Sequence, residues 1–242
     1  MSILKVGPGE FEPGLIIFDK DGTLIDFEAM WGAWIIELAA RLEALAGRPV
    51  RGKLFEALGY DAGRGKVIAD GKLVATPMAI LFTLTIEVLE RCGLSAEAAG
   101  AAVQDAWHIP DPVALARPFT PLPELFGRLR AGGIRIAVAT TDDRGPTEAT
   151  LRGLGVDGLI DALICADDGI PVKPAPDMVT AICARLGLPP RLAIVVGDSA
   201  ADLQMARAAG AGLVVGVASG ASPAAALAPL ADVVIDSIAG LV

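Results

Sequence analysis

Short aliphatic runs recur along the chain and alternate with helix-like stretches. The runs are mostly apolar and lack regular alternation, which is typical of strands buried on both faces of a parallel sheet. They cover residues 15–18, 134–139, 159–164, 192–196, 213–217 and 233–235. The helix-like stretches cover residues 121–131, 146–153, 176–186 and 200–209. This order predicts an α/β fold with a doubly wound, Rossmann-like parallel sheet.

A long segment, residues 19–133, separates the first predicted strand from the second and is far longer than an ordinary crossover. Its apolar residues fall at steps of three and four from Met30 to Leu45, which predicts a long helix with one apolar face. We interpret Trp31 and Trp34 on that face as core packing between the inserted helices and the sheet domain. Further helices are predicted over residues 77–91 and 95–107, the second beginning at an N-cap.

The ends of this helical segment are marked by composition. Residues 59–72 are rich in Gly, Lys and Arg and predict a loop, while the Pro-rich residues 109–123 predict the return of the chain to the sheet. We therefore predict an α/β core formed by residues 1–26 and 115–242. An α-helical domain, residues 27–114, is inserted into that core.

Composition excludes several classes of protein. With 242 residues, 53% of them hydrophobic, the chain can bury a core, which excludes a disordered protein. Lys and Arg number 20 against 29 Asp and Glu, a net charge of −9, so we expect neither nucleic acid nor an anionic membrane as a partner. Residues 1–8 lack the pattern of a secretory signal, and no apolar stretch reaches the roughly 18 residues that span a bilayer.

The cysteines and the histidine indicate a reducing compartment and argue against zinc. The three cysteines, Cys92, Cys165 and Cys183, are odd in number and show no paired spacing, so we expect reduced thiols in the cytoplasm. His108 is the only histidine of the chain. A zinc site is therefore not expected.

Four polar motifs lie past the C-terminal ends of predicted strands, where open α/β sheets bind their ligands. They are FDKDGTL at residues 18–24, Thr140 with Thr141, KPAPD at residues 173–177 and GDSAAD at residues 197–202. We expect the carboxylates of these motifs to converge, and because crowded carboxylates repel one another, a cation should lie among them. Oxygen ligands without His or Cys favour Mg²⁺. With a lysine, a hydroxyl and a glycine nearby, such a site can hold a phosphoryl group.

Taken together, the four motifs resemble those of the haloacid dehalogenase-like (HAD) hydrolase superfamily. The helical insertion resembles the α-helical cap of the phosphoglycolate-phosphatase-like branch of that superfamily. The resemblance covers nearly the whole chain, with core motifs from residue 18 to residue 202 and the cap at about residues 25–115. Four motifs in this order and spacing are a specific signal.

The resemblance implies roles for individual residues. Asp19 would be the nucleophile that forms an aspartyl-phosphate, and Asp21 the general acid–base. Mg²⁺ would be held by Asp19, the main-chain carbonyl of Asp21, Asp198 and, in support, Asp202. The residues implied to bind the phosphate are Thr140, Thr141, Lys173 and Gly22.

The sequence departs from the family pattern in two places. Lys20 replaces the aliphatic residue usual between the two aspartates, and Thr141-Asp142-Asp143 stands where Asn or Ser is common. Neither departure falls on a position that the family uses in catalysis. We expect both to alter the entrance to the site, and so the choice of substrate.

The leading hypothesis is a cytoplasmic, Mg²⁺-dependent phosphatase, a monomer or homodimer, that acts on a small phosphorylated metabolite such as phosphoglycolate or a sugar phosphate. A phosphomutase and a phosphonoacetaldehyde hydrolase, which would need a cap lysine such as Lys53, are alternatives from the same superfamily. Asp21 argues against a haloacid dehalogenase, which does not need it. A receiver-type signalling domain or a silent binding protein is the alternative outside enzymes.

Overall fold

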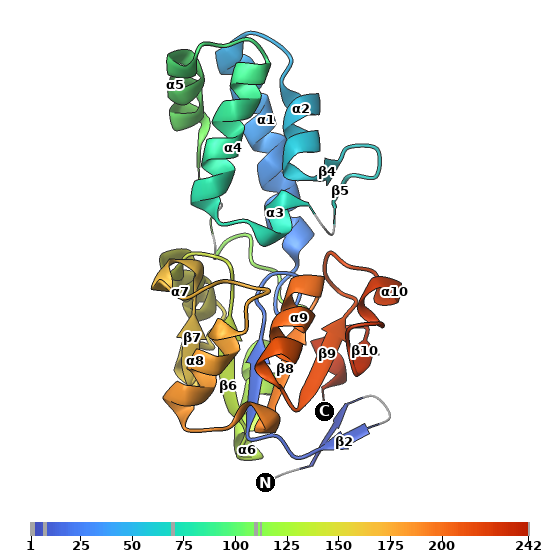
Figure 1. Ribbon diagram of the computed structural model, residues 1–242. Helices are drawn as coiled ribbons and strands as arrows, with labels where there is room; N and C mark the ends of the chain where they lie inside the picture. Colours follow the sequence, from blue (N-terminus) through green and yellow to red (C-terminus); the bar gives the residue numbers. More distant parts are fainter. Residues whose placement is uncertain (1–2, 7–8, 69–70, 109–110, 112, 242) are drawn as a thin grey trace. The chain divides into compact units, whose positions relative to one another are not determined.

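The computed structural model describes residues 3–6, 9–68, 71–108, 111 and 113–241. The chain divides into two compact units, an α/β unit formed by Met1–Phe27 with Ala116–Val242 and a helical unit formed by Glu28–Leu115 (Figure 1). The boundaries proposed from the sequence lie one residue earlier, after residues 26 and 114. Each unit is described by itself.

The α/β unit is built on a parallel sheet of six strands with the order β10-β9-β8-β3-β6-β7. All five pairs of neighbouring strands are parallel, which confirms the predicted fold class. The strands are β3 (Leu15–Phe18), β6 (Arg135–Ala139), β7 (Ala162–Ile164), β8 (Ala193–Gly197), β9 (Leu213–Val217) and β10 (Val233–Ile235). Every residue of β3 and β8 is buried, as expected of strands covered on both faces.

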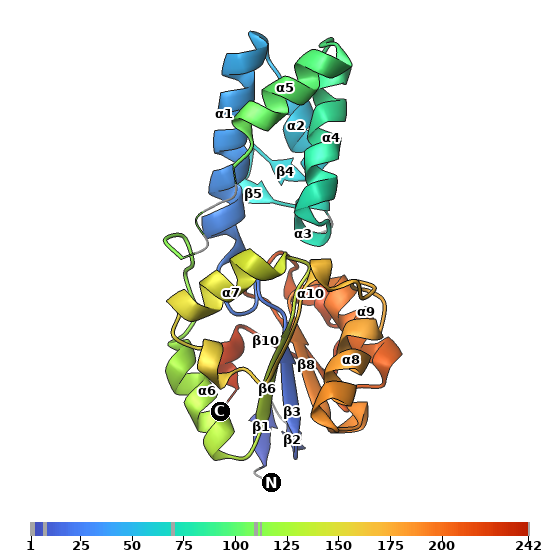
Figure 2. The ribbon, with the colours of Figure 1, turned by 90° about the vertical axis from the view of Figure 1, so that its left-hand side faces the viewer.

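Helices cover both faces of this sheet. Figure 2 shows α6 (Leu122–Ala131) and α7 (Arg144–Gly153) on one face and α8 (Asp177–Leu186) and α9 (Ala200–Ala209) on the other. On the first face, Phe18 stacks on Phe126 with ring centroids 5.4 Å apart. The second face buries aliphatic and sulfur-containing side chains of α8 and α9. A shorter helix, α10 (Ala224–Leu227), lies between β9 and β10 in the chain.

Short elements of the α/β unit were not expected from the sequence. An antiparallel hairpin of β1 (Leu4–Val6) and β2 (Gly9–Phe11) precedes the first predicted strand. The strand predicted over residues 159–164 begins only at residue 162, because Asp157–Leu159 form the 3₁₀ turn η2. Three further 3₁₀ turns are η3 (Ala166–Asp168), η4 (Pro190–Leu192) and η5 (Ile238–Gly240). Elements of two or three residues are too short to show a period.

The helical unit contains the predicted long helix, which begins with a π-helical turn, η1 (Glu28–Gly32), and continues as α1 (Ala33–Ala46). The two further predicted helices are α4 (Met78–Arg91) and α5 (Ala96–Ala106). The N-cap of α5 is confirmed, since the side-chain oxygen of Ser95 accepts the N–H of Ala98 at 3.2 Å. Helices α2 (Arg51–Leu58) and α3 (Lys72–Ala75) were not predicted.

Aromatic side chains form the centre of the helical unit. Trp34 is 2% exposed and meets Trp31 and Trp107 edge-on, with ring centroids 5.6 and 5.2 Å apart. Its indole N–H donates to the carbonyl of His108 at 2.7 Å. The tryptophans therefore pack a core, but the partners recorded for Trp34 belong to the helical unit itself, and the predicted packing between that unit and the sheet domain stays a prediction.

The segment expected to be a loop, residues 59–72, contains a small antiparallel hairpin of β4 (Tyr60–Asp61) and β5 (Lys66–Val67). Asp61 closes its turn by accepting the N–H groups of Gly63 and Arg64 at 2.9 and 3.1 Å. Residues 69–70 of this segment, and residues 109, 110 and 112 of the Pro-rich return, lie outside the described residues. No helix in the described part of the chain is long and apolar enough to cross a membrane.

Candidate active site

The register of the central strands brings sequence-distant segments to one edge of the sheet. Phe18, the last residue of β3, lies opposite Val138 of β6 and Val196 of β8, and the three strands run in the same direction. The residues that follow β3 therefore leave the sheet beside those that follow β6 and β8, where Thr140 and Asp198 lie. This is the carboxyl edge at which open α/β sheets bind ligands.

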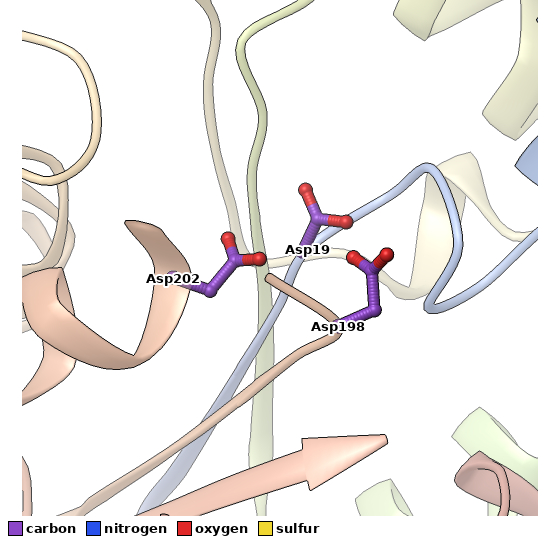
Figure 3. A group of neighbouring side chains, drawn as sticks. All are labelled: Asp19, Asp198 and Asp202. Carbon is purple, nitrogen blue, oxygen red and sulfur yellow. The ribbon is translucent and has the colours of Figure 1, made fainter. Parts of the chain in front are cut away.

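Three carboxylates meet at this edge. Asp19 follows β3, Asp198 follows β8, and Asp202 lies in the first turn of α9. Each offers a carboxylate oxygen, and these oxygens lie within 4.8 Å of one another. Figure 3 shows the three side chains directed toward a common space. Asp198 and Asp202 are each only 2% exposed.

Lys173, from the loop that precedes α8, bridges two of these carboxylates. Its amino group donates to Oδ1 of Asp19 at 2.6 Å and to Oδ1 of Asp202 at 2.5 Å. The Lys173 side chain is only 4% exposed. We call Lys173, Asp19, Asp198 and Asp202 the Lys173 cluster. It holds three carboxylates against one ammonium group.

The pKa values of the Lys173 cluster reflect this imbalance of charge. Burial raises the pKa of Asp19 to about 7, although Lys173 acts in the opposite direction. Burial, with Asp19 and Asp202 nearby, also raises the pKa of Asp198 well above its ordinary value. Burial alone would lower the pKa of Lys173, but the carboxylates of Asp19 and Asp202 outweigh it and raise that pKa. The lysine therefore stays charged, while the carboxylates lack compensating positive charge.

Asp202 uses both of its oxygens within the protein. Oδ1 accepts from Lys173, and Oδ2 accepts the backbone N–H of Ser199 at 3.1 Å and its hydroxyl at 2.6 Å. The Ser199 hydroxyl oxygen accepts the N–H of Asp202 in return, which completes a capping box at the start of α9. Asp202 therefore anchors Lys173 to the helix, and the less occupied carboxylates are those of Asp19 and Asp198.

A loop that the sequence analysis did not single out holds Asp198 in place. It follows β9, and its residue Ala221 donates a backbone N–H to Oδ2 of Asp198 at 2.8 Å. A side chain at Gly220 would collide with the Asp198 carboxylate. The hydroxyl of Ser219 donates to the carbonyl of Gly22 at 2.9 Å, which ties this loop to the first motif. The sequence around Gly220 signals a turn and gives no hint of these contacts.

The donor set of the Lys173 cluster fits a divalent cation that prefers oxygen ligands, such as Mg²⁺. Its acidic members offer carboxylate oxygens only, and these already lie close enough to share an ion. The raised pKa values of Asp19 and Asp198 show that additional positive charge would be favourable here. A bound dication would supply that charge without protonating either carboxylate.

Asp21 belongs to a second group of charges at the same edge. The amino group of Lys20 lies 2.5 Å from Oδ2 of Asp21 and 2.9 Å from Oδ2 of Asp142. Its side chain is 2% exposed, against 12% for Asp21 and 19% for Asp142. Burial alone would lower the pKa of Lys20, but the two carboxylates raise it. We call these three residues the Lys20 cluster.

This arrangement corrects one expectation from the sequence. We expected Lys20 and Thr141-Asp142-Asp143 to alter the entrance to the site without involving a catalytic position. Instead Lys20 is buried and contacts Asp21 directly, and its second partner, Asp142, is the other departure from the family pattern. The two departures therefore form one ion pair inside the protein.

The remaining predicted residues lie at the same edge. The hydroxyl oxygen of the buried Thr140 accepts the N–H of Asp142 at 3.1 Å, and Thr141 is half-buried. Gly22 has φ +88°, which favours glycine, and a side chain there would collide with the Asp198 carboxylate. Its N–H donates to the carbonyl of Ile25 at 2.7 Å, inside the turn. Phosphate binding by Thr140, Thr141 and Gly22 stays a prediction.

A comparison with known protein families decides the classification. The family model described as haloacid dehalogenase-like hydrolase matches residues 13–210. The chain belongs to the haloacid dehalogenase-like hydrolase family. The predicted resemblance is therefore confirmed, and the matched residues include all four motifs of this HAD chain.

Relatives of this HAD chain include phosphoglycolate phosphatases. A phosphoglycolate phosphatase of Rhodospirillum rubrum is 38% identical over 110 residues, which cover 46% of each protein. The chain thus spans under half the length of this relative. A plasmid-encoded phosphoglycolate phosphatase of Cupriavidus necator is 28% identical over 229 residues, 93% of this chain and 90% of the relative.

The solved structures agree on the fold. The crystal structure of a predicted phosphoglycolate phosphatase from Haemophilus somnus matches with a TM-score of 0.67. The match covers 96% of this chain and 97% of the Haemophilus somnus chain. Its sequence identity is only 20%, so it supports the HAD fold and carries no argument about substrate.

Proposed function

We propose that this chain is a Mg²⁺-dependent phosphatase that hydrolyses a small phosphate monoester through an aspartyl-phosphate on Asp19. One observation carries the proposal: Asp19 lies at the carboxyl edge of β3 with its carboxylate held by Lys173 and close to that of Asp198. A nucleophile, a fixed cation and a second carboxylate are the groups that phosphoryl transfer through a covalent intermediate needs. The names of the relatives support phosphoglycolate as the first candidate substrate.

In the first half of the reaction, an oxygen of the Asp19 carboxylate attacks phosphorus. The bond between phosphorus and the ester oxygen breaks, and Asp21 gives its proton to that oxygen, which leaves as an alcohol. Lys173, already in contact with Asp19, holds the nucleophile in one orientation and offers positive charge to the phosphoryl oxygens.

In the second half, Asp21 takes a proton from a water molecule whose oxygen attacks phosphorus. The bond to Asp19 breaks, which releases inorganic phosphate and restores the Asp19 carboxylate. Mg²⁺ bound by Asp19, the carbonyl of Asp21 and Asp198 would neutralise negative charge on the phosphoryl group. Asp202 would support the site by anchoring Lys173, which agrees with its occupied oxygens.

No contact among the described residues specifically favours the alternatives within the family. Lys53, the candidate for a Schiff base in a phosphonoacetaldehyde hydrolase, donates its amino group to the carbonyl of Arg91 at 2.8 Å, at the end of α4. A phosphomutase would use the same groups and differs in the fate of the phosphoryl group. The cytoplasmic location and the state of monomer or homodimer stay predictions.

A panel of phosphate monoesters, containing phosphoglycolate and sugar phosphates, tests the proposal. We expect release of inorganic phosphate with Mg²⁺ and none with EDTA. Transfer of the phosphoryl group to a second hydroxyl of a sugar phosphate would identify a mutase instead. Absence of turnover of every ester in the presence of Mg²⁺ would contradict the proposal.

A further inference from the structure

Lys20 occupies an unusual position for a lysine. Its side chain is almost completely buried, and its ammonium group lies between the carboxylates of Asp21 and Asp142, 2.5 and 2.9 Å away. A buried ammonium is costly unless it is paired, and here it is paired twice. The two carboxylates therefore hold the ammonium group of Lys20 in one place.

The backbone around Lys20 fixes that place further. The carbonyl of Lys20 accepts the N–H groups of Leu24 and Ile25 at 2.9 and 3.1 Å, which folds residues 20–25 into a tight turn. Asp142 lies beyond β6, and its N–H donates to the hydroxyl oxygen of Thr140. Lys20 thus joins the turn of the first motif to the segment that follows the second motif.

We propose that Lys20 is a positioning residue for Asp21, and that Asp142 acts through Lys20 by fixing its ammonium group. A cation in contact with one oxygen of a carboxylate restricts the rotation of the whole group. Proton transfer depends on the direction and distance of the donating group, so an Asp21 carboxylate released from Lys20 is a poorer acid and base. The inference rests on the proposed function, since it assumes that Asp21 transfers the proton.

The measured quantity is the dependence of kcat/KM on the leaving group of the ester. A p-nitrophenolate leaves without help from an acid, whereas the alkoxide of an alkyl phosphate must be protonated as it leaves. Loss of Asp21 positioning therefore lowers kcat/KM for the alkyl ester much more than for p-nitrophenyl phosphate. A general decrease in folded or metal-loaded enzyme lowers both values by the same factor.

The experiment compares phosphoglycolate with p-nitrophenyl phosphate for six proteins: wild type, Asp21→Asn, Lys20→Met, Asp142→Asn, the double variant Lys20→Met/Asp142→Asn and the control Asp161→Asn. For Lys20→Met we expect kcat/KM to fall at least about tenfold more for phosphoglycolate, a part of the 10²–10⁴-fold that general acid catalysis contributes. Asp142→Asn, which keeps the size of the side chain, should show a smaller selective loss. The double variant should match Lys20→Met, because Asp142 acts through Lys20.

Asp161 is a matched control because its carboxylate also pairs with a cation, Arg130 at 2.8 Å, and its side chain is 22% exposed. Its replacement should affect both esters equally. If Asp21→Asn is selective while Lys20→Met and Asp142→Asn lower both values equally, the positioning role is wrong and the proposed function stands. If Asp21→Asn itself shows no selectivity, the role of Asp21 in the proposed function fails, and the inference fails with it.

Discussion

The two charged clusters of the site have the same arrangement of a lysine between two carboxylates, but the Lys173 cluster has one additional carboxylate. In each, a buried lysine lies between two carboxylates, Lys173 between Asp19 and Asp202 and Lys20 between Asp21 and Asp142. The Lys173 cluster contains a third carboxylate, Asp198, whose recorded hydrogen bond comes from a backbone N–H. The Lys173 cluster is therefore suited to take up a cation, whereas the Lys20 cluster is more nearly balanced and suited to hold a side chain still.

The largest effect should come from the nucleophile of the Lys173 cluster. Asp19→Asn removes the attacking oxygen, and we expect kcat to fall by at least about 10³-fold, in the range seen when a nucleophile is lost. Steady-state kinetics with the best ester of the panel measures this, with Asp161→Asn as the control. Turnover by Asp19→Asn within tenfold of wild type would remove Asp19 from the mechanism.

The difference between the two clusters is tested by replacing each lysine in turn and measuring the stability of the variant. Lys173→Met and Lys20→Met both leave buried or largely buried carboxylates without their cation, which should cost about 3–5 kcal/mol of unfolding free energy. Urea denaturation with and without Mg²⁺ separates the clusters. Mg²⁺ should restore more stability to Lys173→Met than to Lys20→Met, because a dication can replace the lost charge only where several carboxylates face one another. Equal restoration would show that the two clusters do not differ as described.

The role of Asp198 is tested by metal binding to the intact protein. At a Mg²⁺ concentration of about 100 times Kd, wild-type enzyme should gain about 2.7 kcal/mol of stability. Asp198→Asn should lose most of this gain, because it replaces a charged oxygen ligand by a neutral amide, while Asp142→Asn should keep it. Thermal unfolding at several Mg²⁺ concentrations measures the difference. A full Mg²⁺ response in Asp198→Asn would argue against a metal at this cluster.

An ion pair outside both clusters shows how much unfolding free energy a pair with a partly exposed cation contributes. Arg144 binds Asp168 through two nitrogens at 2.9 and 2.6 Å and holds the pKa of that carboxyl below its usual value. Because the folded pKa is lowered, the pair contributes stability above the unfolded pKa of about 3.9 and loses it as pH falls below that value. Asp168→Asn should cost only about 1 kcal/mol at pH 7, since Arg144 is partly exposed.

Denaturation of this variant and wild type between pH 7 and pH 3 checks the sign. The difference in unfolding free energy should shrink as pH falls. A difference that grows toward pH 3, or one as large as that for Lys20→Met at pH 7, would contradict the contrast between a pair with a partly exposed cation and a pair with a buried one.

Much of the fold and the core of the site could be predicted from the sequence. Strands buried on both faces must be apolar along their length, so β3, β8 and β9 are visible as runs, and parallel strands end at one edge. That rule is enough to predict that Asp19 and Asp198, which lie far apart in the sequence, are close together in the fold. The residue types at this edge then indicate phosphate chemistry.

The parts that could not be predicted depend on side-chain direction in irregular segments. Lys20 lies two residues after the end of β3, and no periodic pattern there tells whether its long side chain reaches solvent or turns inward to Asp142. The backbone N–H of Ala221 donates to Asp198, and the alanine side chain gives no indication of this contact in the sequence. The turn of the β4–β5 hairpin is closed by backbone N–H groups that donate to Asp61, in a segment whose composition indicates only a loop.

The central claim is that Asp19 accepts the phosphoryl group. Mass spectrometry of peptides from enzyme that has been acid-quenched during turnover of phosphoglycolate with Mg²⁺ tests it most directly. We predict one added phosphoryl group on the peptide that contains Asp19, and none in Asp19→Asn or after EDTA treatment. Turnover of the ester with no label on that peptide, or a label retained in Asp19→Asn, would contradict the account.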